Sequence, residues 1–239
     1  AQRADVVVIG AGYTGLSTAL HLAERGYTVT VLEAERAGWG ASGRNGGHVG
    51  TGQRADQQTL EKLVGKQRAR ALWDMSRESV ELVSQLVEDW HIDCELKKGN
   101  LELAHTAAAS RELREDADHM QAVYDFDAIR YLEQDEISAL TSARGYFGGS
   151  INTAARHLHP LNYCLGLAAA AAESGATIYE NSRVSHYEER ETLRVHCDSG
   201  HVDCEFLVLA CNGYLGKLEK RVAGQIMPIN NYLIATEPL

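Results

Sequence analysis

The sequence predicts an α/β fold with a parallel sheet, on three observations near its amino terminus. The first is DVVVI at residues 5–9, a β-branched run typical of strands that are buried on both faces. The second is the glycine turn GAGYTG, which follows at residues 10–15. The third is a stretch with helical spacing that leads to a second run, YTVTVLE, at residues 27–33. Strand, glycine turn, helix and strand in this order predict a Rossmann-like βαβ unit.

The helix between the two runs is predicted by the apolar residues Leu16, Ala19, Leu20 and Ala23, which recur at three-and-four spacing. Gly26 follows them and is expected just after the helix end, where glycine is common. The loop before this helix and the end of the second strand therefore lie at the same edge of the sheet.

The three turn glycines each have a predicted task. Gly10 permits the tight turn, Gly12 lets the backbone approach a pyrophosphate, and Gly15 allows close helix packing. Glu33 ends the second strand, where a carboxylate accepts hydrogen bonds from an adenosine ribose and disfavours NADP. A βαβ unit that binds no ligand is the alternative. The turn alone does not distinguish NAD from FAD.

A second glycine cluster, GWGASGRNGG at residues 38–47, favours FAD. It has no apolar periodicity, and a loop this long and glycine-rich needs a function or is mobile. Our hypothesis is that it lies along the pyrophosphate and reaches the flavin ring. Ser42 would hydrogen-bond phosphate, while Gly46 and Gly47 would leave room for the ring. The alternative is a mobile surface loop.

Composition narrows the class of protein. The net charge of −10 argues against nucleic-acid binding, because phosphate backbones require a basic surface. The five cysteines include no CxxC pair, which indicates reduced thiols. No run of eighteen apolar residues and no leader pattern stands out, so we expect a cytoplasmic protein without membrane contact.

The remaining chain alternates between helical and strand patterns. Residues 57–90 predict a helical region interrupted near Gly65. The stretch 92–150 breaks the βα order and is the expected insertion. Further predicted elements are a strand in 99–104, helices in 107–120, 131–140 and 161–173, a strand in 176–180, and a hairpin in 193–213 that turns at Ser199-Gly200.

Two groups of metal-ligand residue types do not predict a metal site. His157 and His159 in HLHP are two possible cation ligands, and the hairpin carries His196, Cys197, His201 and Cys204. Consecutive strand residues point to opposite faces, so His196 and Cys197 do not converge, and neither group has zinc-finger spacing. We expect no metal.

The segment from Asp5 to Gly47 resembles the amino-terminal end of the FAD-dependent oxidoreductases of the D-amino-acid oxidase family. That family includes sarcosine, glycine and γ-glutamylputrescine oxidases, and GWGASGRNGG is most similar to the last of these branches. Residues 206–216 and the terminal MPINNYLIATEPL carry the resemblance further.

The resemblance implies a discontinuous FAD-binding domain, residues 1–90 and 151–222, with an inserted α+β substrate domain. Residues 91–150 and 223–239 would form part of the latter. Family members are longer, so we expect the carboxyl-terminal half to be absent here and to come from further chain or from a second polypeptide.

The resemblance also implies site residues. A strand at residues 183–186 would pass the adenine, with a backbone contact at Val184. A turn of small residues would close over the cofactor, although Cys211-Asn212 departs from the family pattern. The expected FAD-binding residues are Gly10, Gly12, Gly15, Glu33, Ala34, Arg36, Ser42, Gly43, Gly46, Gly47, Val184, Ala210 and Gly213.

The implied reaction is oxidation of a small-molecule amine. A hydride passes from the substrate C–H bond to flavin N5, the imine becomes an aldehyde and ammonia, and oxygen reoxidises the flavin. A γ-glutamylputrescine-like substrate is expected; the alternatives are an amino-acid, sarcosine or glycine-type oxidase or dehydrogenase, and a non-catalytic dinucleotide-binding fragment. The catalytic candidates are His48, Arg44 and Asn45. His48 would accept a proton or be a solvated loop residue. Arg44 would bind a substrate carboxylate or hold the loop in place.

Overall fold

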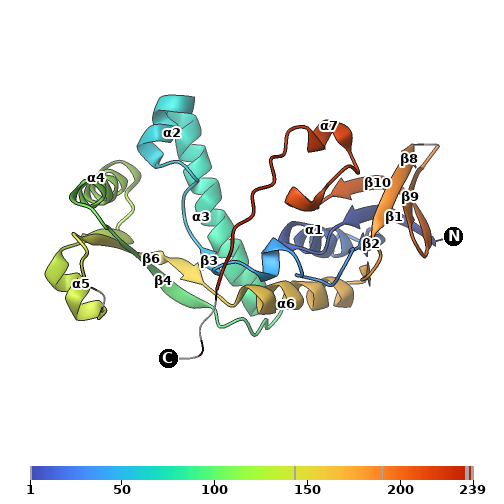
Figure 1. The fold of residues 1–239 in the computed structure, drawn as a ribbon, viewed down its shortest axis with the longest axis horizontal. Helices are drawn as coiled ribbons and strands as arrows, with labels where there is room; N and C mark the ends of the chain where they lie inside the picture. Colours follow the sequence, from blue (N-terminus) through green and yellow to red (C-terminus); the bar gives the residue numbers. More distant parts are fainter. Residues whose placement is uncertain (1, 143, 190, 235–236, 238–239) are drawn as a thin grey trace. The chain divides into compact units, whose positions relative to one another are not determined.

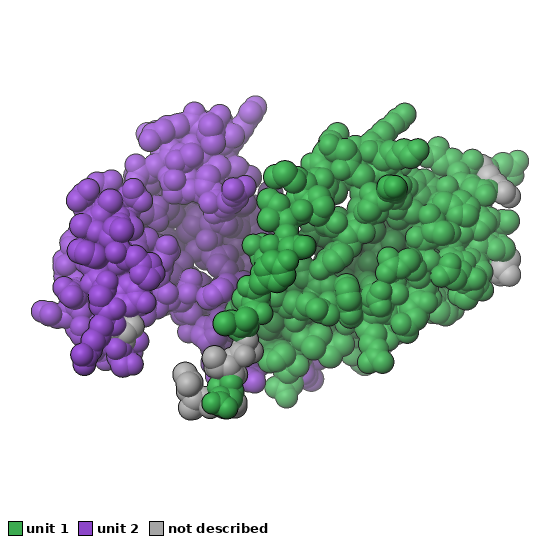
Figure 2. All heavy atoms as spheres, viewed as in Figure 1, with its two compact units in different colours: residues 1–46, 92–94, 159–239 green, residues 47–91, 95–158 purple. Residues whose placement is uncertain are grey.

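The computed structural model describes residues 2–142, 144–189, 191–234 and 237. The chain forms two compact units (Figure 2). Unit 1 comprises Ala1–Gly46, Ile92–Cys94 and His159–Leu239, and unit 2 comprises Gly47–His91 and Glu95–Leu158. Each unit has its own sheet, and the two are considered separately.

Unit 1 contains a six-stranded sheet in the order β7-β2-β1-β10-β9-β8. The strands β7, β2, β1 and β10 are parallel, whereas β9 and β8 extend the sheet in antiparallel fashion (Figure 1). The strand bounds are β1 Gln2–Ile9, β2 Val29–Leu32, β7 Thr177–Tyr179, β8 Val184–Glu189, β9 Leu193–Cys197 and β10 Gly200–Leu209.

Two helices of unit 1, α1 (Tyr13–Ala23) and α6 (Pro160–Glu173), pack against each other. Pro160 stands in the first turn of α6, where its missing N–H costs no hydrogen bond. His159 caps that helix, because its Nδ1 accepts a hydrogen bond from Asn162 N at 3.2 Å. Shorter helical segments are η1 Ala41–Gly43, η2 Asn212–Tyr214 and α7 Lys220–Ala223.

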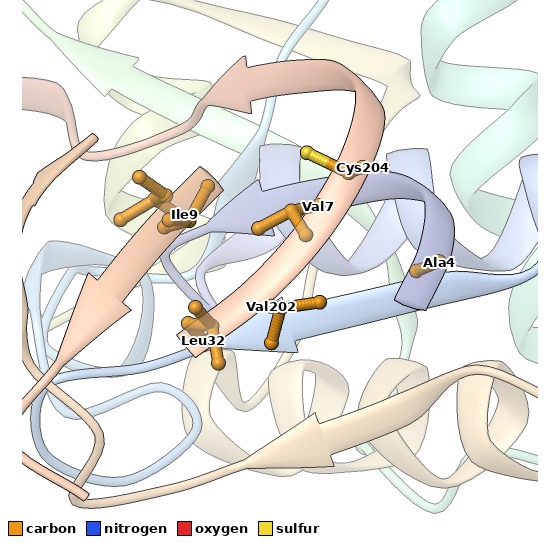
Figure 3. Packing of buried hydrophobic residues seen from close by; sticks show 7 residues of the cluster. Ala4, Val7, Ile9, Leu32, Val202 and Cys204 are labelled. Carbon is orange, nitrogen blue, oxygen red and sulfur yellow. The ribbon is translucent and has the colours of Figure 1, made fainter. Parts of the chain in front are cut away.

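The core of the sheet is formed by small and β-branched side chains (Figure 3). Val7 and Val195 are fully buried, and Leu32 is nearly so. Burial of each such side chain stabilises the fold by roughly 1.5–3 kcal/mol. The cluster consists of Ala4, Val7, Ile9, Leu32, Val195, Val202 and Cys204.

The described residues of unit 2 form four helices and a small antiparallel sheet whose central strand is β6. β4 pairs along β6, while β5 pairs with residues 149–152 and β3 with 156–157. Trp73, Met120, Tyr124 and Phe126 form a core cluster. The elements are β3 His48–Val49, α2 Gln57–Val64, α3 Lys66–Asp89, β4 Lys97–Leu103, α4 Ala107–Tyr124, β5 Ile129–Leu132, α5 Gln134–Leu140 and β6 Gly149–His157.

The predicted βαβ start and the helix break near Gly65 are confirmed. Gly65 has φ +83° and ψ 154°, a conformation essentially confined to glycine. Two details of the prediction are wrong. Residues 129–132 form β5 ahead of the expected helix, and the hairpin loop consists of Asp198 and Ser199, because Gly200 pairs with Cys197.

The compact units differ from the expected domain bounds. Residues 47–90 and 151–158 belong to unit 2 rather than to the unit with the βαβ start. The reason is that α2 and α3 pack together, α2 contacts α4, and β6 completes the sheet of unit 2. Residues 223–234 and 237 group with unit 1, and the rest of the expected segment 223–239 lies outside the described residues. The functional assignment of each unit stays a prediction.

Among the described residues, no helix is both long enough and apolar enough to cross a membrane.

Candidate cofactor site

A cavity of about 390 Å³ lies in unit 1 at the carboxyl ends of three parallel strands. Ile9 ends β1 and Leu32 ends β2, and both line it, as does Ala210 immediately after β10. Open α/β sheets bind ligands at this edge. The lining segments are residues 9–12, 32–35, 39–42, 183–185, 210–212 and 214–218.

The turn glycines explain why this edge is open. Gly10 has φ +108°, and a Cβ there would lie 2.7 Å from the Ala210 carbonyl oxygen. A Cβ at Gly12 would lie 2.7 Å from Ser42 Oγ, within the cavity wall. A Cβ at Gly15 would collide with the Gly10 carbonyl oxygen, so glycine allows α1 to pack against the turn. Larger residues would close the turn or displace the helix.

The amino terminus of α1 faces this turn without a cap from its own N-cap residue. Gly12 is the N-cap residue and has no side chain to bond the first-turn N–H groups. Tyr13 N donates to Ser42 Oγ at 3.0 Å, so the glycine-rich loop lies beside the helix start. The first turn of a helix carries a partial positive charge, which favours a phosphate group.

Glu33 is held at the end of β2 by two backbone groups. Its Oε2 accepts a hydrogen bond from Ala11 N at 2.7 Å, and its Oε1 accepts one from Glu35 N at 2.9 Å. A carboxylate offers about four acceptor positions, so two remain for hydroxyl donors in the cavity. The side chain therefore combines a fixed position with spare hydrogen-bonding capacity.

The family was identified by comparison with known sequences. Residues 5–239 match the FAD dependent oxidoreductase family. The chain belongs to this family. The predicted resemblance, the α/β fold class and FAD as the family cofactor are thereby confirmed.

Several individual relatives of this FAD-dependent oxidoreductase chain are similar along its whole length. It is 36% identical to the probable oxidoreductase OrdL of Rhizobium meliloti (100% of this chain, 56% of the relative) and 36% identical to the gamma-glutamylputrescine oxidoreductase of Escherichia coli (98% and 55%). The crystal structure of glycine oxidase from Geobacillus kaustophilus superposes with a TM-score of 0.74 at 23% identity (93% and 59%) and supports the fold. The chain spans about half the length of the curated relatives it matches.

The cavity fits the adenosine and pyrophosphate parts of FAD. The residues that would hold the pyrophosphate are Gly10, Gly12 and Ser42, because close backbone approach and uncapped N–H groups suit an anion. Glu33 would bind the ribose hydroxyls. The predicted FAD-binding residues that line this cavity are Gly10, Gly12, Glu33, Ala34, Ser42, Val184 and Ala210.

The other predicted FAD-binding residues do not line it. Gly15 and Gly43 serve packing, since a Cβ at Gly43 would collide with the Gly38 carbonyl oxygen. Arg36 is exposed, and its carbonyl accepts a hydrogen bond from Trp39 N at 3.0 Å. Gly213 lies beside Pro228. Gly46 ends a segment of unit 1, whereas Gly47 belongs to unit 2.

The three catalytic candidates lie outside the cavity wall. Arg44 Nε donates to the Trp39 carbonyl at 2.6 Å, and its guanidinium lies 4.7 Å from the Trp39 ring, which favours the loop-pin role. Asn45 Nδ2 donates to the carbonyls of Ala41 and Ser42 at 3.0 and 2.9 Å. His48 is exposed in β3 of unit 2, opposite His157. Their catalytic roles stay predictions.

Sequence reasoning missed several cavity residues. Trp39 and Tyr214 line the cavity with ring centroids 6.2 Å apart, and both stand next to glycine in the sequence, which is the signal that was available. Arg183 Nη2 donates to Glu35 Oε1 at 2.8 Å across the cavity rim. The pairing of β2 with β7, continued by Asn181 N donating to the Glu35 carbonyl at 2.7 Å, brings the two residues together, so no local pattern could have revealed this ion pair.

The cysteines are consistent with reduced thiols. All five lie in the described part of the chain, and none forms a disulfide. Burial raises the pKa of Cys164 to about 12, and burial together with Glu33 raises that of Cys211 to about 11. Both stay protonated near neutral pH and are poor nucleophiles.

Proposed function

We propose that the full-length protein oxidises an amine with FAD held in the unit 1 cavity. The observation that carries the proposal is that one cavity joins the GAGYTG turn, the Glu33 carboxylate and the glycine-rich segment 39–42. In a member of the FAD-dependent oxidoreductase family, these are the groups that a two-phosphate cofactor requires.

The chain's own residues mainly bind and orient. First-turn N–H groups of α1 would hold the pyrophosphate, and Glu33 would fix the adenosine end. Bound FAD would supply a two-electron acceptor. The C–H bond beside the amine nitrogen breaks, and its hydrogen and electron pair leave the substrate. Water then converts the imine to an aldehyde and ammonia, and oxygen takes both electrons to give hydrogen peroxide. His48 stays a candidate for holding the amine proton.

The proposed substrate is a γ-glutamylputrescine-like amine. The support is the 36% identity to the Escherichia coli gamma-glutamylputrescine oxidoreductase over 98% of this chain. The net charge of −10 also favours the approach of a cationic amine. The rival is an amino acid or N-methyl amino acid, which shares the oxidisable C–H bond beside nitrogen.

The test is anaerobic reduction of the flavin in the full-length protein. We expect γ-glutamylputrescine to bleach the flavin absorbance and, in air, to release peroxide, while glycine, sarcosine and D-alanine do neither. Bleaching by amino acids alone would replace the substrate but keep the cofactor site. A protein without flavin bands even after added FAD would overturn the whole proposal.

The cofactor site has its own test in Glu33→Gln. The amide removes one acceptor and the charge while keeping the side-chain shape, so we expect FAD affinity to fall roughly 10- to 100-fold, as for a lost hydrogen bond to a charged group. Glu24→Gln is the matched control, because Glu24 is exposed at the far end of α1. Equal FAD affinity in both variants would remove Glu33 from the site.

The candidate His48 is tested by His48→Gln. Unchanged rates of flavin reduction and turnover would discard it as a catalytic group, whereas a slower reduction step with unchanged FAD affinity would retain it.

A further inference from the structure

Unit 2 contains a cavity of about 570 Å³ on one face of its sheet. Glu102 of β4 lies opposite Ser150 of β6 in the register, and both line the cavity, so this face of the two strands forms part of its wall. Residues 50–58 and one side of α4 contribute further wall. All the lining residues belong to unit 2, and none of them lines the cofactor cavity. The cavity is therefore built by one unit alone.

Carboxylates outnumber cationic side chains in the wall of this cavity. Asp56 is already satisfied, because it accepts hydrogen bonds from Thr59 N at 2.7 Å and from the Thr59 hydroxyl at 2.8 Å. These bonds and, to a smaller extent, the charge of Lys62 lower the pKa of Asp56. The lining carboxylates are Asp56, Glu102, Glu112, Glu115 and Asp116, and the lining cationic residues are Arg54 and Lys62. The wall therefore carries an excess of negative charge.

Asp116 is the carboxylate of this wall that shows the excess most directly. It is half-buried on α4 and forms no hydrogen bond or ion pair with any residue in the described part of the chain. Burial, followed by the negative charge of Asp56, raises the pKa of Asp116. Glu102 adds to this rise, whereas His119 opposes it. A raised pKa means that the ionised carboxylate is poorly compensated, so a bound cation would stabilise it.

The Ser150 hydroxyl is an independent sign of a ligand. The residue is 5% exposed and lines the cavity, yet its hydroxyl forms no hydrogen bond with the residues that the structure describes. A buried hydroxyl without a partner costs free energy. Its oxygen can accept a hydrogen bond, so an N–H donor placed between Ser150 and Glu102 on the neighbouring strand would satisfy both.

The spacing of the carboxylates favours an organic cation over a metal ion. No three of the carboxylates described in this wall bring oxygen atoms within 4.8 Å of one another. Ca²⁺ and Mg²⁺ need several oxygen ligands at about 2.0–2.6 Å, so they would lack ligands here. Glu112 stands one helical turn before Asp116, and side chains at this spacing lie roughly 5–6 Å apart. Two ammonium groups at a similar separation would meet both carboxylates.

Apolar side chains line another part of the same wall. Trp73 and Met120 are 4% and 3% exposed, and Ile129 lies opposite Asn152 in the register. Methylene groups that contact these side chains would leave water, which favours binding. A ligand that joins ammonium groups by a methylene chain matches both kinds of wall.

We infer that the unit 2 cavity binds an aliphatic diamine or polyamine. One ammonium group would lie between Asp116, Glu102 and Ser150. A second would lie near Glu112, which is exposed, and the methylene groups between them would contact Trp73. The inference does not depend on the proposed oxidation, because the cavity shares no residue with the cofactor cavity.

The test is calorimetric titration of the full-length protein with 1,4-diaminobutane. Binding should be saturable, and the affinity should fall at least about 10-fold in Asp116→Asn and about 2- to 10-fold in Ser150→Ala, as for lost hydrogen bonds to charged and neutral groups. Asp118→Asn is the matched control, because it removes the same charge from an exposed residue of α4 that does not line the cavity. Wild-type protein without saturable binding, or equal affinity in Asp116→Asn and Asp118→Asn, would overturn the site.

A second measurement uses the wild-type protein only, so it does not depend on how the variants fold. Butylamine, with one ammonium group, should bind at least about 10-fold more weakly than the diamine, and 1,4-butanediol should not bind. Magnesium chloride should displace the diamine no better than sodium chloride of equal ionic strength. Equal affinity for butylamine and the diamine, or specific displacement by Mg²⁺, would contradict the assignment.

Flavin reduction separates this cavity from the site of the proposed oxidation. Asp116→Asn should be reduced by γ-glutamylputrescine as fast as Asp118→Asn, because neither residue lines the cofactor cavity. A variant that loses diamine binding and flavin reduction together would place the diamine in the reaction site and overturn the inference. The calorimetric result holds whichever substrate reduces the flavin.

Discussion

Single residues fix the geometry of the cofactor cavity, and Gly15 is the clearest case. Its place on α1 faces the carbonyl of Gly10, so any Cβ would press directly on backbone. Backbone cannot rotate away as a flexible side chain can, and overpacking at such a contact shifts the helix. The residue type is therefore set by contact between helix and turn rather than by the ligand.

We expect Gly15→Ala to lower the free energy of unfolding by roughly 1–3 kcal/mol, measured by urea denaturation of the full-length protein. Gly224→Ala is the control in the same unit, because Gly224 has φ −66° and the nearest atom to its added Cβ is the Lys220 carbonyl oxygen at 3.5 Å. A similar loss in both variants would contradict the steric argument.

Asp5 gives a prediction of pH dependence. Hydrogen bonds from the Thr28 backbone N–H and then its hydroxyl lower the pKa of Asp5. A carboxylate with a lowered folded-state pKa stabilises the fold above its unfolded pKa, about 3.9, and loses this effect as the pH falls through the folded value. The melting temperature of Asp5→Asn should therefore lie below wild type at pH 7, and the gap should shrink below about pH 4.

The control for this titration is Asp198→Asn, in the exposed hairpin loop. Its melting temperature should follow wild type over the whole pH range. A gap between Asp5→Asn and wild type that does not change with pH would show that the carboxylate charge is not responsible.

At the scale of elements, the break between α2 and α3 depends on one glycine. Gly65 ends α2 and begins α3, and its N–H still donates to Glu61 O at 3.0 Å. No heavy atom lies within 4 Å of a Cβ built there, so space is not the constraint. The backbone angles alone require glycine.

Gly65→Ala should therefore lower the free energy of unfolding by about 1–3 kcal/mol, the usual cost of an unsuitable residue in such a conformation. Gly65→Asn should not rescue it, because ψ of 154° lies outside the left-handed region that asparagine tolerates. Gly50→Ala, in open space of the same unit, should change stability little. Equal stability of Gly65→Ala and Gly50→Ala in urea denaturation would refute the backbone argument.

The sequence predicted those elements whose signal is local. The β1 run, the glycine turn and α1 follow one another directly, so spacing alone identified them. β6 escaped because GSINTAARH lacks clear alternation of apolar and polar residues. In the same wall of the cofactor cavity, Val184 was named only through the family resemblance, and Arg183 and Ser185 escaped because the pairing of β8 with β9 has no local signature.

At the scale of the whole molecule, unit 1 should respond to FAD as one body. Hydrogen exchange of the full-length protein with and without FAD should show slower exchange in the residues that line the cavity, which are 9–12, 32–35, 39–42, 183–185, 210–212 and 214–218. Saturation at 100 times the dissociation constant should stabilise the folded state by about 2.7 kcal/mol.

Residues 50–58 of unit 2, which line a separate cavity, are the internal control and should change little. Slower exchange confined to residues 50–58 would place the cofactor elsewhere. Exchange that slows equally in every peptide would indicate general stabilisation rather than a site at this sheet edge.

The order of strands has a consequence for synthesis of the protein. β10 lies between β1 and β9 in space, yet about two hundred residues separate β1 from it along the chain. The ribosome must release the segment through Leu218 before the cavity walls exist. Coenzyme capture is thus a late event in biogenesis. Until then β1 has β2 on one side only, and chaperones would have to shield its other edge.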